Sequence, residues 1–100
     1  MAMNWRRIKT EMEFQEAFAD KTFVGEGAVF TIHSDGRMTG GIGDSHFLGQ
    51  WYWDSGYFCR TAILDGEALE LDCEVIEILA NQMRYTRGKG AGRSTVVTIA

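Results

Sequence analysis

The chain contains no proline, two cysteines and no long apolar run among its 100 residues. Because proline removes a donor from a β-sheet ladder, its absence beside twelve glycines favours a twisted sheet built from hairpins. No apolar run approaches the ~18–20 residues of a membrane-spanning helix, so we expect no membrane span. Residues 1–7 are too polar for a signal peptide. As given, the sequence predicts a cytoplasmic protein, or a periplasmic or exported one if a signal peptide has been removed.

Basic residues are also scarce, with ten lysines and arginines against fourteen aspartates and glutamates. The formal charge of -4 and the pI of about 5.0 argue against a nucleic-acid partner, because phosphates require a basic surface. The length suffices for one domain with one modest core and leaves no room for a separate cofactor-binding domain. We therefore expect a single domain over residues 1–100 and no cofactor.

Turn signals, by contrast, are abundant, and they recur about every ten residues over the last two thirds of the chain, as in consecutive β-hairpins. Short runs rich in β-branched and aromatic residues lie between them. The pattern predicts strands at 28–33, 37–42, 46–53, 57–64, 69–79, 82–87 and 93–99, with a further short strand at 22–25.

The fold class that follows is mainly β. We predict an antiparallel meander of seven or eight strands over residues 22–99, forming a small barrel or half-open roll. The uncharged last strand would be an aggregation-prone edge unless the first strand pairs with it, closing a barrel, or a second copy covers it. A flatter sheet that dimerises through its edge strands is the alternative.

One helix is predicted at residues 10–20, packed across one opening or face of the sheet. Thr10 and Glu13 have the spacing of a capping box, in which each side chain accepts a backbone N–H. Ile8 precedes the cap as a candidate hydrophobic staple. The apolar stripe that would dock the helix consists of Met12, Phe14, Ala17 and Phe18.

The two cysteines flank the turn at 65–66. A hairpin centred on Gly66 places Cys59 directly opposite Cys73, within disulfide reach. The same reasoning for a hairpin centred on Ser55 places Trp51 opposite Cys59, so that all three side chains share one face. In a cytosolic chain the cysteines are expected to be reduced core residues; in an exported chain a disulfide becomes the expectation.

Residues 51–60, with the sequence WYWDSGYFCR, resemble the core of a family of small uncharacterised α-proteobacterial proteins. In that family a Trp-x-Trp-x-x-Gly-Tyr-Phe-Cys-Arg core precedes a second cysteine and a basic, glycine-rich segment, here at 72–76 and 83–90. The resemblance extends from about residue 10 to residue 99 and implies no activity. Some members resemble exported proteins. Others carry a dihydrodipicolinate reductase label, but that reaction requires a dinucleotide-binding βαβ unit, which this length and β pattern exclude.

Catalytic chemistry finds little support in the sequence. His33 and His46 each lie two residues from an aspartate, yet the strand between them, at ~3.3 Å per residue, separates them by roughly 20 Å. The serines lie in turns, where they bond locally, and no nucleophilic triad can be assembled from them. Cys59 has only Arg60 nearby to activate it. We therefore predict no catalytic residues, no metal site and a non-enzymatic protein.

Two groups of residues are candidates for binding. The aromatic core of the resemblance predicts a ligand site at the barrel mouth formed by Trp51, Trp53, Tyr57, Phe58 and Arg60. The glycine-rich segment predicts an anion patch formed by Arg84, Arg87, Lys89 and Arg93, unless it is a solvated hairpin tip. Two of these arginines can instead pair across their hairpin with acidic residues, Arg84 with Glu77 and Arg87 with Glu74.

Two functions remain open at this point. The first is a small binding module for an apolar small molecule at the barrel mouth. The second is a structural or protein-interaction domain, such as a homodimer, in which the aromatic residues are core. Because many large apolar residues compete for a small barrel, we expect a mostly self-filled interior and buried Trp51 and Trp53. Any pocket is expected to be shallow and to open beside the helix at 10–20.

Overall fold

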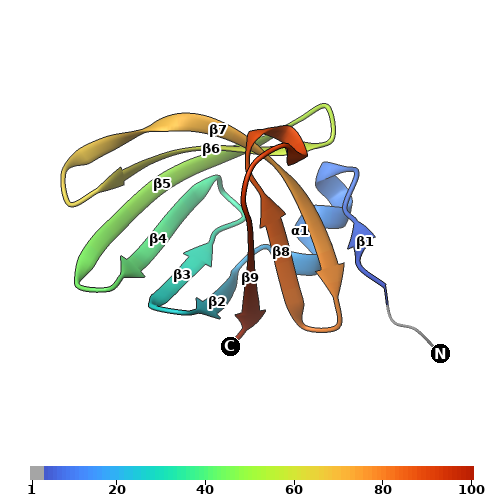
Figure 1. The fold of residues 1–100 in the computed structure, drawn as a ribbon, viewed down its shortest axis with the longest axis horizontal. Helices are drawn as coiled ribbons and strands as arrows, with labels where there is room; N and C mark the ends of the chain where they lie inside the picture. Colours follow the sequence, from blue (N-terminus) through green and yellow to red (C-terminus); the bar gives the residue numbers. More distant parts are fainter. Residues whose placement is uncertain (1–3) are drawn as a thin grey trace.

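The computed structural model describes residues 4–100, so the first three residues of the N-terminal segment considered above lie outside it. One sheet, one α-helix and one short 3-10 helix make up this part of the chain (Figure 1). The helices are α1 (Glu11–Phe18) and η1 (Gly88–Gly90). The strands are β1 (Arg6–Arg7), β2 (Lys21–Gly25), β3 (Ala28–Ile32), β4 (Arg37–Ile42), β5 (Ser45–Asp54), β6 (Tyr57–Leu64), β7 (Glu67–Leu79), β8 (Gln82–Thr86) and β9 (Ser94–Ile99).

The sheet is antiparallel and closes into an eight-stranded barrel. Strands β2 to β9 pair in chain order, and β9 also pairs with β2 through Phe23 and Ile99. The predicted meander and its closure by the first and last barrel strands are thus confirmed, whereas the flatter, edge-paired sheet is wrong. Each predicted strand is present, with its ends within two residues of the predicted ones.

The long strand β7 is shared between two neighbours. Its first half pairs with β6 as far as Glu74, and its second half pairs with β8 from Val75 onward. Where β7 leaves β6, the short strand β1 takes its place, with Arg6 opposite Ile78. The two-residue strand β1 was not predicted, because a run so short has no periodicity to detect.

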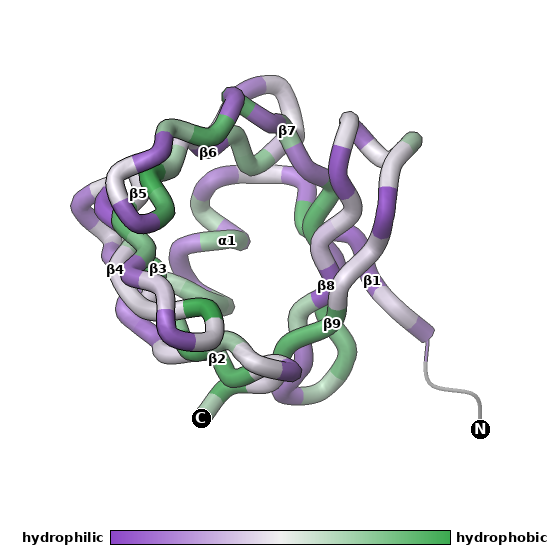
Figure 2. The backbone as a smooth tube through the Cα atoms, turned by 60° about the vertical axis from the view of Figure 1, so that its left-hand side comes forward, coloured by the Kyte–Doolittle hydropathy of each residue, from purple (hydrophilic) through white to green (hydrophobic). Residues whose placement is uncertain are grey.

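Helix α1 begins as the capping box predicts and covers one opening of the barrel (Figure 2). The N–H of Glu13 donates to the Thr10 hydroxyl, which in turn lies 3.2 Å from the Glu13 carboxylate. Phe14 and Phe18 are fully buried. Met12, predicted to join their stripe, is 72 % exposed. The stripe was wrong there because residues two apart on a helix point to different faces.

The buried aromatic residues of the barrel gather beneath this helix. The Phe14 ring lies between 5.0 and 5.4 Å from the rings of Trp51, Trp53 and Phe58, centroid to centroid. Ile8, just before the cap, is also fully buried. Docking of α1 therefore depends on this cluster, because an eight-residue helix is marginal by itself.

The β5–β6 pairing differs from the predicted one by one residue. Ser55 and Gly56 form a tight two-residue turn with φ of 52° and 90°, so that Asp54 pairs with Tyr57. Trp51 consequently lies opposite Arg60, and not opposite Cys59 as predicted. Since a shift of one residue reverses the face, the tryptophan points into the barrel.

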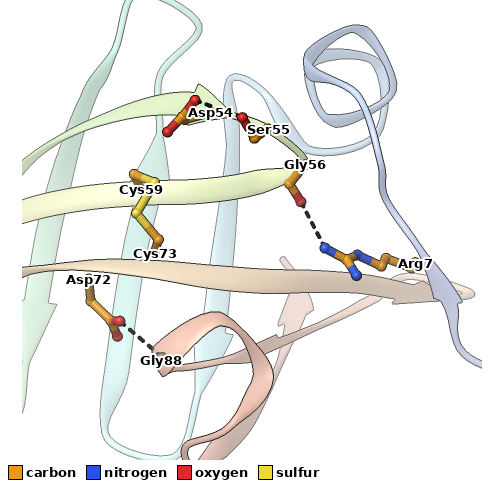
Figure 3. Close-up of a disulfide and its surroundings, with 8 residues drawn as sticks. All are labelled: Arg7, Asp54, Ser55, Gly56, Cys59, Asp72, Cys73 and Gly88. Atoms are coloured by element: carbon orange, nitrogen blue, oxygen red, sulfur yellow. Dashed lines mark hydrogen bonds between the residues drawn. A yellow bond between two sulfur atoms is a disulfide. The ribbon is translucent and has the colours of Figure 1, made fainter.

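The predicted pairing of Cys59 with Cys73 is confirmed, on the outer face of β6 and β7 (Figure 3). Their Cα atoms are 4.0 Å apart, and of the two states considered the structure has the disulfide. The predicted pair of Glu77 and Arg84 is present as well, with two hydrogen bonds of 2.8 and 2.9 Å.

Candidate functional site

A cavity of about 90 Å³ lies inside the barrel. It extends from the end away from α1 (Figure 1), where Ala28, Ile42 and Leu69 adjoin hairpin turns, to Phe58, whose ring packs against Phe14. The predicted opening beside the helix was wrong, because Phe14 and Phe18 fill that end of the barrel. The apolar walls of the cavity consist of Ala28, Phe30, Ile32, Met38, Ile42, Phe47, Phe58, Leu69, Ile76 and Met83.

Four polar side chains line the same cavity: Arg60, Glu74, Tyr85 and Arg87. They come from three neighbouring segments, namely β6, β7, and β8 with the residue that follows it. Glu74 is central to the group, since it occupies the position at which β7 changes partner from β6 to β8. The polar residues therefore gather on one side of an otherwise apolar cavity.

Glu74 is 3 % exposed, and its Oε2 atom has no hydrogen-bond partner among the described residues. Burial raises the pKa of this carboxyl group to about 7, and the negative charge of Asp72 acts in the same direction. The positive charges of Arg60 and Arg87 oppose the rise. Near neutral pH, Glu74 can thus either accept or donate a hydrogen bond.

The two arginines of the cavity have no carboxylate partner within ion-pair distance. In the part of the chain that the structure describes, the arginines in such pairs are Arg6, Arg37 and Arg84. Arg60 donates only a long hydrogen bond of 3.4 Å, to the backbone oxygen of a neighbouring residue on β7. Neither guanidinium group is thus held by a carboxylate of residues 4–100, and Arg87 is also exposed to solvent.

The wall of the cavity is connected to the disulfide through β7, which carries Leu69 and Glu74 as well as Cys73. Asp72, the residue before Cys73, accepts a hydrogen bond of 3.0 Å from the backbone N–H of Gly88 (Figure 3). This bond attaches η1 to β7 beside Arg87. The disulfide and the η1 contact together hold β6, β7 and the β8–β9 connection, which carry the polar group.

The predicted aromatic site is only partly reproduced. Phe58 and Arg60 line the cavity, whereas Trp51, Trp53 and Tyr57 do not. Trp51 is buried in the core as predicted, while Trp53 is only partly buried. Tyr57 lies on the outer surface, under the cationic groups of Arg7 and Lys89.

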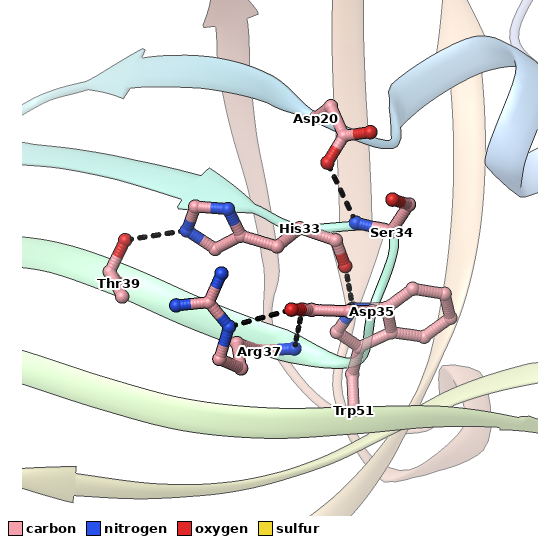
Figure 4. A network of polar contacts seen from close by, with 7 residues as sticks. All are labelled: Asp20, His33, Ser34, Asp35, Arg37, Thr39 and Trp51. Atoms are coloured by element: carbon pink, nitrogen blue, oxygen red, sulfur yellow. Dashed lines mark hydrogen bonds and ion pairs between the residues drawn. The ribbon is translucent and has the colours of Figure 1, made fainter.

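The buried Trp51 is held by a polar contact at the helix end of the barrel (Figure 4). Its indole N–H donates a hydrogen bond of 2.8 Å to the backbone oxygen of His33. In the same turn, the Asp20 carboxylate accepts the backbone N–H of Ser34. These hydrogen bonds satisfy the buried indole N–H of Trp51 and a backbone N–H of the turn, so Trp51 has a structural role.

The predicted anion patch does not gather at one place. Arg84 is paired with Glu77, and Lys89 lies over an aromatic ring on the outer surface. Arg87 and Arg93 are both exposed, and of the set Arg87 alone lines the cavity. The predicted pair of Arg87 with Glu74 is not formed as an ion pair, although both residues face the cavity.

The two histidines lie near opposite ends of β4, as predicted. The Nε2 atom of His33 is 2.8 Å from the Thr39 hydroxyl, and the backbone N–H of His46 donates to the Asp65 carboxylate. Within residues 4–100, no three side chains of His, Cys, Asp or Glu lie close enough to hold a metal ion.

Sequence reasoning missed Glu74 and Tyr85 as site residues. The sequence predicts a cross-strand pair of Glu74 with Arg87, although Glu74 and Ile76 share a strand face. A charged residue on the same face as an apolar strand residue was the available signal, since strand residues two apart face the same side. No such signal distinguished Tyr85, because a tyrosine on a strand of a β-barrel is commonly a core residue.

The fold and cavity define the class of protein: a small, single-domain antiparallel β-barrel. Comparison of the chain with protein-family models, curated proteins and solved structures finds no match. In residues 4–100, none of the helices has the length and apolar character needed to span a bilayer.

Proposed function

We propose that the protein is a binding module that holds a small molecule with an apolar body inside its barrel. The observation that carries this proposal is a largely apolar cavity lined by Glu74, whose buried carboxyl oxygen Oε2 has no hydrogen-bond partner within residues 4–100. Protein interiors are normally close-packed, and an unpaired buried polar group costs about 1–3 kcal/mol. A ligand that fills the cavity and bonds to Glu74 would remove both costs.

The size of the cavity limits the ligand. About 90 Å³ is well below the roughly 300–1,000 Å³ typical of sites for drug-sized molecules. The occupant is therefore a small molecule, or a longer one of which only the end enters the barrel. Entry is from the end away from α1, where the partly exposed Ile42 and Leu69 form the rim.

A protein-interaction domain is the second candidate function, supported by a different surface. Leu48 and Ile63 lie opposite each other on the outer face of β5 and β6, and both are exposed. Leu71 on β7 is exposed as well. Neighbouring exposed apolar side chains such as Leu48 and Ile63 are typical of contact surfaces, including those of homodimers.

The disulfide supports a location in a non-reducing compartment, because intracellular thiols are normally kept reduced. Trapping the free thiols of the protein in its native cells tests this location. Oxidised Cys59 and Cys73 would support an exported or periplasmic protein, and two trapped thiols would support the cytoplasm.

Titration with an apolar fluorescent probe tests the binding module. We expect saturable binding to the wild type and at least tenfold weaker binding to Ala28→Leu, whose added methyl groups occupy the cavity. Val29→Leu is the matched control, because Val29 is the exposed neighbour on the same strand. Absence of probe binding, together with a concentration-dependent dimer, would favour the interaction domain instead.

A further inference from the structure

The polar group of the cavity has a composition that selects among ligands. Arg60 and Arg87 carry fixed positive charges, and neither has a carboxylate partner within ion-pair distance in the described chain. Glu74 lies between the strands that supply them and presents an unpartnered oxygen. A ligand group that satisfies all three must accept hydrogen bonds from two guanidinium groups and also bond to a carboxyl group.

We propose that the ligand is a small amphiphile with a carboxylate head group, bound by Arg60, Arg87 and Glu74, with its apolar end inside the barrel. This inference rests on the proposed function and specifies the ligand class of the same cavity. Guanidinium groups match the planar geometry of a carboxylate, with two parallel N–H donors per arginine. The apolar side chains that line the cavity, among them Phe30 and Met83, suit an alkyl chain or a small ring.

Glu74 completes the head-group site in its protonated form. A protonated carboxyl group donates one O–H to an anionic oxygen, so that Glu74 and the ligand carboxylate share one proton. The charged groups that face Glu74 are Arg60 on β6, Asp72 on β7 and Arg87 after β8. Tyr85 on β8 lines the same cavity.

Other head groups fit this arrangement less well. An ammonium group would be repelled by Arg60 and Arg87, and its single favourable contact would be with Glu74. A neutral hydroxyl group could bond to Glu74 but would leave the two guanidinium groups without an anion. The carboxylate is therefore the head group for which each polar side chain has a complementary partner.

Calorimetric titration with octanoate, 1-octanol and octylammonium tests the proposal, because the three probes share a chain and differ in head group. We expect octanoate to bind at least tenfold more tightly than the other two, as expected for charge-assisted hydrogen bonds. Equal or tighter binding of octanol or octylammonium would overturn the carboxylate proposal and leave the binding module standing. Failure of all three, together with failure of the apolar fluorescent probe, would overturn the binding module itself.

Substitution of the two arginines tests where the carboxylate head group binds. Arg60→Gln and Arg87→Gln should each weaken octanoate binding about tenfold or more, with less than threefold change for octanol. Arg93→Gln is the matched control, being exposed, in the same basic segment and away from the cavity walls. Thermal unfolding of each variant checks that the fold is retained. Equal losses for octanoate and octanol, or an equal loss in Arg93→Gln, would contradict the proposed site.

The pH dependence of octanoate binding provides an independent test of whether Glu74 is protonated in the complex. Octanoate stays ionised between pH 6 and pH 8, so its affinity should fall as the pH rises only if Glu74 must be protonated. Glu74→Gln retains a hydrogen-bond donor at every pH and should bind with no such fall. A wild-type affinity for octanoate that does not change over this range would refute the role of Glu74.

Discussion

Glu74 lies directly opposite Phe58, on the inward face of β6 and β7, one pair along from the outward-facing disulfide of Cys59 and Cys73. The same two strands thus carry a buried carboxyl group on one side and a covalent link on the other. Strand alternation produces this arrangement, since neighbouring pairs face opposite sides of a sheet. The link restrains the strands on which the carboxyl group and Arg60 are positioned.

Burial of Glu74 should make stability depend on pH. Its pKa rises from 4.5 to about 7 on folding, so the folded state keeps a proton that the unfolded state loses in this range. The free energy of unfolding therefore falls as pH rises from 4.5 to 7, by up to about 3 kcal/mol at about 1.4 kcal/mol per pKa unit. Glu74→Gln should avoid this loss.

Urea denaturation at pH 5 and at pH 8 measures the effect. The gain in stability of Glu74→Gln over the wild type should be larger at pH 8 than at pH 5. Glu67→Gln, at an exposed position on the same strand, is the control and should show no such difference. An identical gain at both values would mean that Glu74 is not buried as a neutral acid.

Removal of the disulfide should lower stability by about 3 kcal/mol, the value expected for a closed loop of about 15 residues. The double variant Cys59→Ala, Cys73→Ala would be compared with oxidised and reduced wild type by chemical denaturation. A reductant should lower the stability of the wild type and leave the double variant unchanged. If the reductant has no effect on the wild type, the cysteines are not linked in solution.

Trp51 should contribute mainly to stability. Its side chain is buried against Phe14 and donates a hydrogen bond to His33, so Trp51→Ala should cost about 3–5 kcal/mol. Tyr52→Ala, at the exposed neighbouring position on the outer face, should cost less than about 1 kcal/mol. Chemical denaturation of both variants measures the difference, and a loss below about 1 kcal/mol for Trp51→Ala would place this tryptophan outside the core.

Gly40 should be intolerant of any side chain. A Cβ atom there would clash with the backbone oxygen of Val29 and lie 2.6 Å from the Cα atom of Phe30. Gly40→Ala should therefore cost at least about 1–3 kcal/mol, as overpacking does. Gly41→Ala is the control, because its nearest contact would be 3.3 Å, from Ser45. Equal melting temperatures for the two variants would contradict the close approach of β3 and β4.

The sequence predicted the features that depend on neighbouring residues. The Thr10–Glu13 cap, the hairpin turns and the alternation along β3 are local, and each was found where the residue types indicate. The Cys59–Cys73 pairing was found as well, although the turn by itself pairs Leu64 with Glu67, and a register shift between Arg60 and Ala62 brings Cys59 opposite Cys73. The preceding hairpin shows the limit of this reasoning, since centring it on Ser55, and not between Ser55 and Gly56, shifted the pairing by one residue and reversed the face of Trp51.

The sequence alone determined two features: the antiparallel meander, with the positions of its strands along the chain, and the helix that precedes it. The tertiary structure decided which barrel end the helix fills, and therefore that the cavity extends to the hairpin turns at the other end. It also decided that Arg60, Glu74 and Arg87 meet there, although 14 and 13 positions separate them along the chain. The physical reason is that closure of the barrel brings distant strand segments together across its interior, and no local pattern records which side chains then meet.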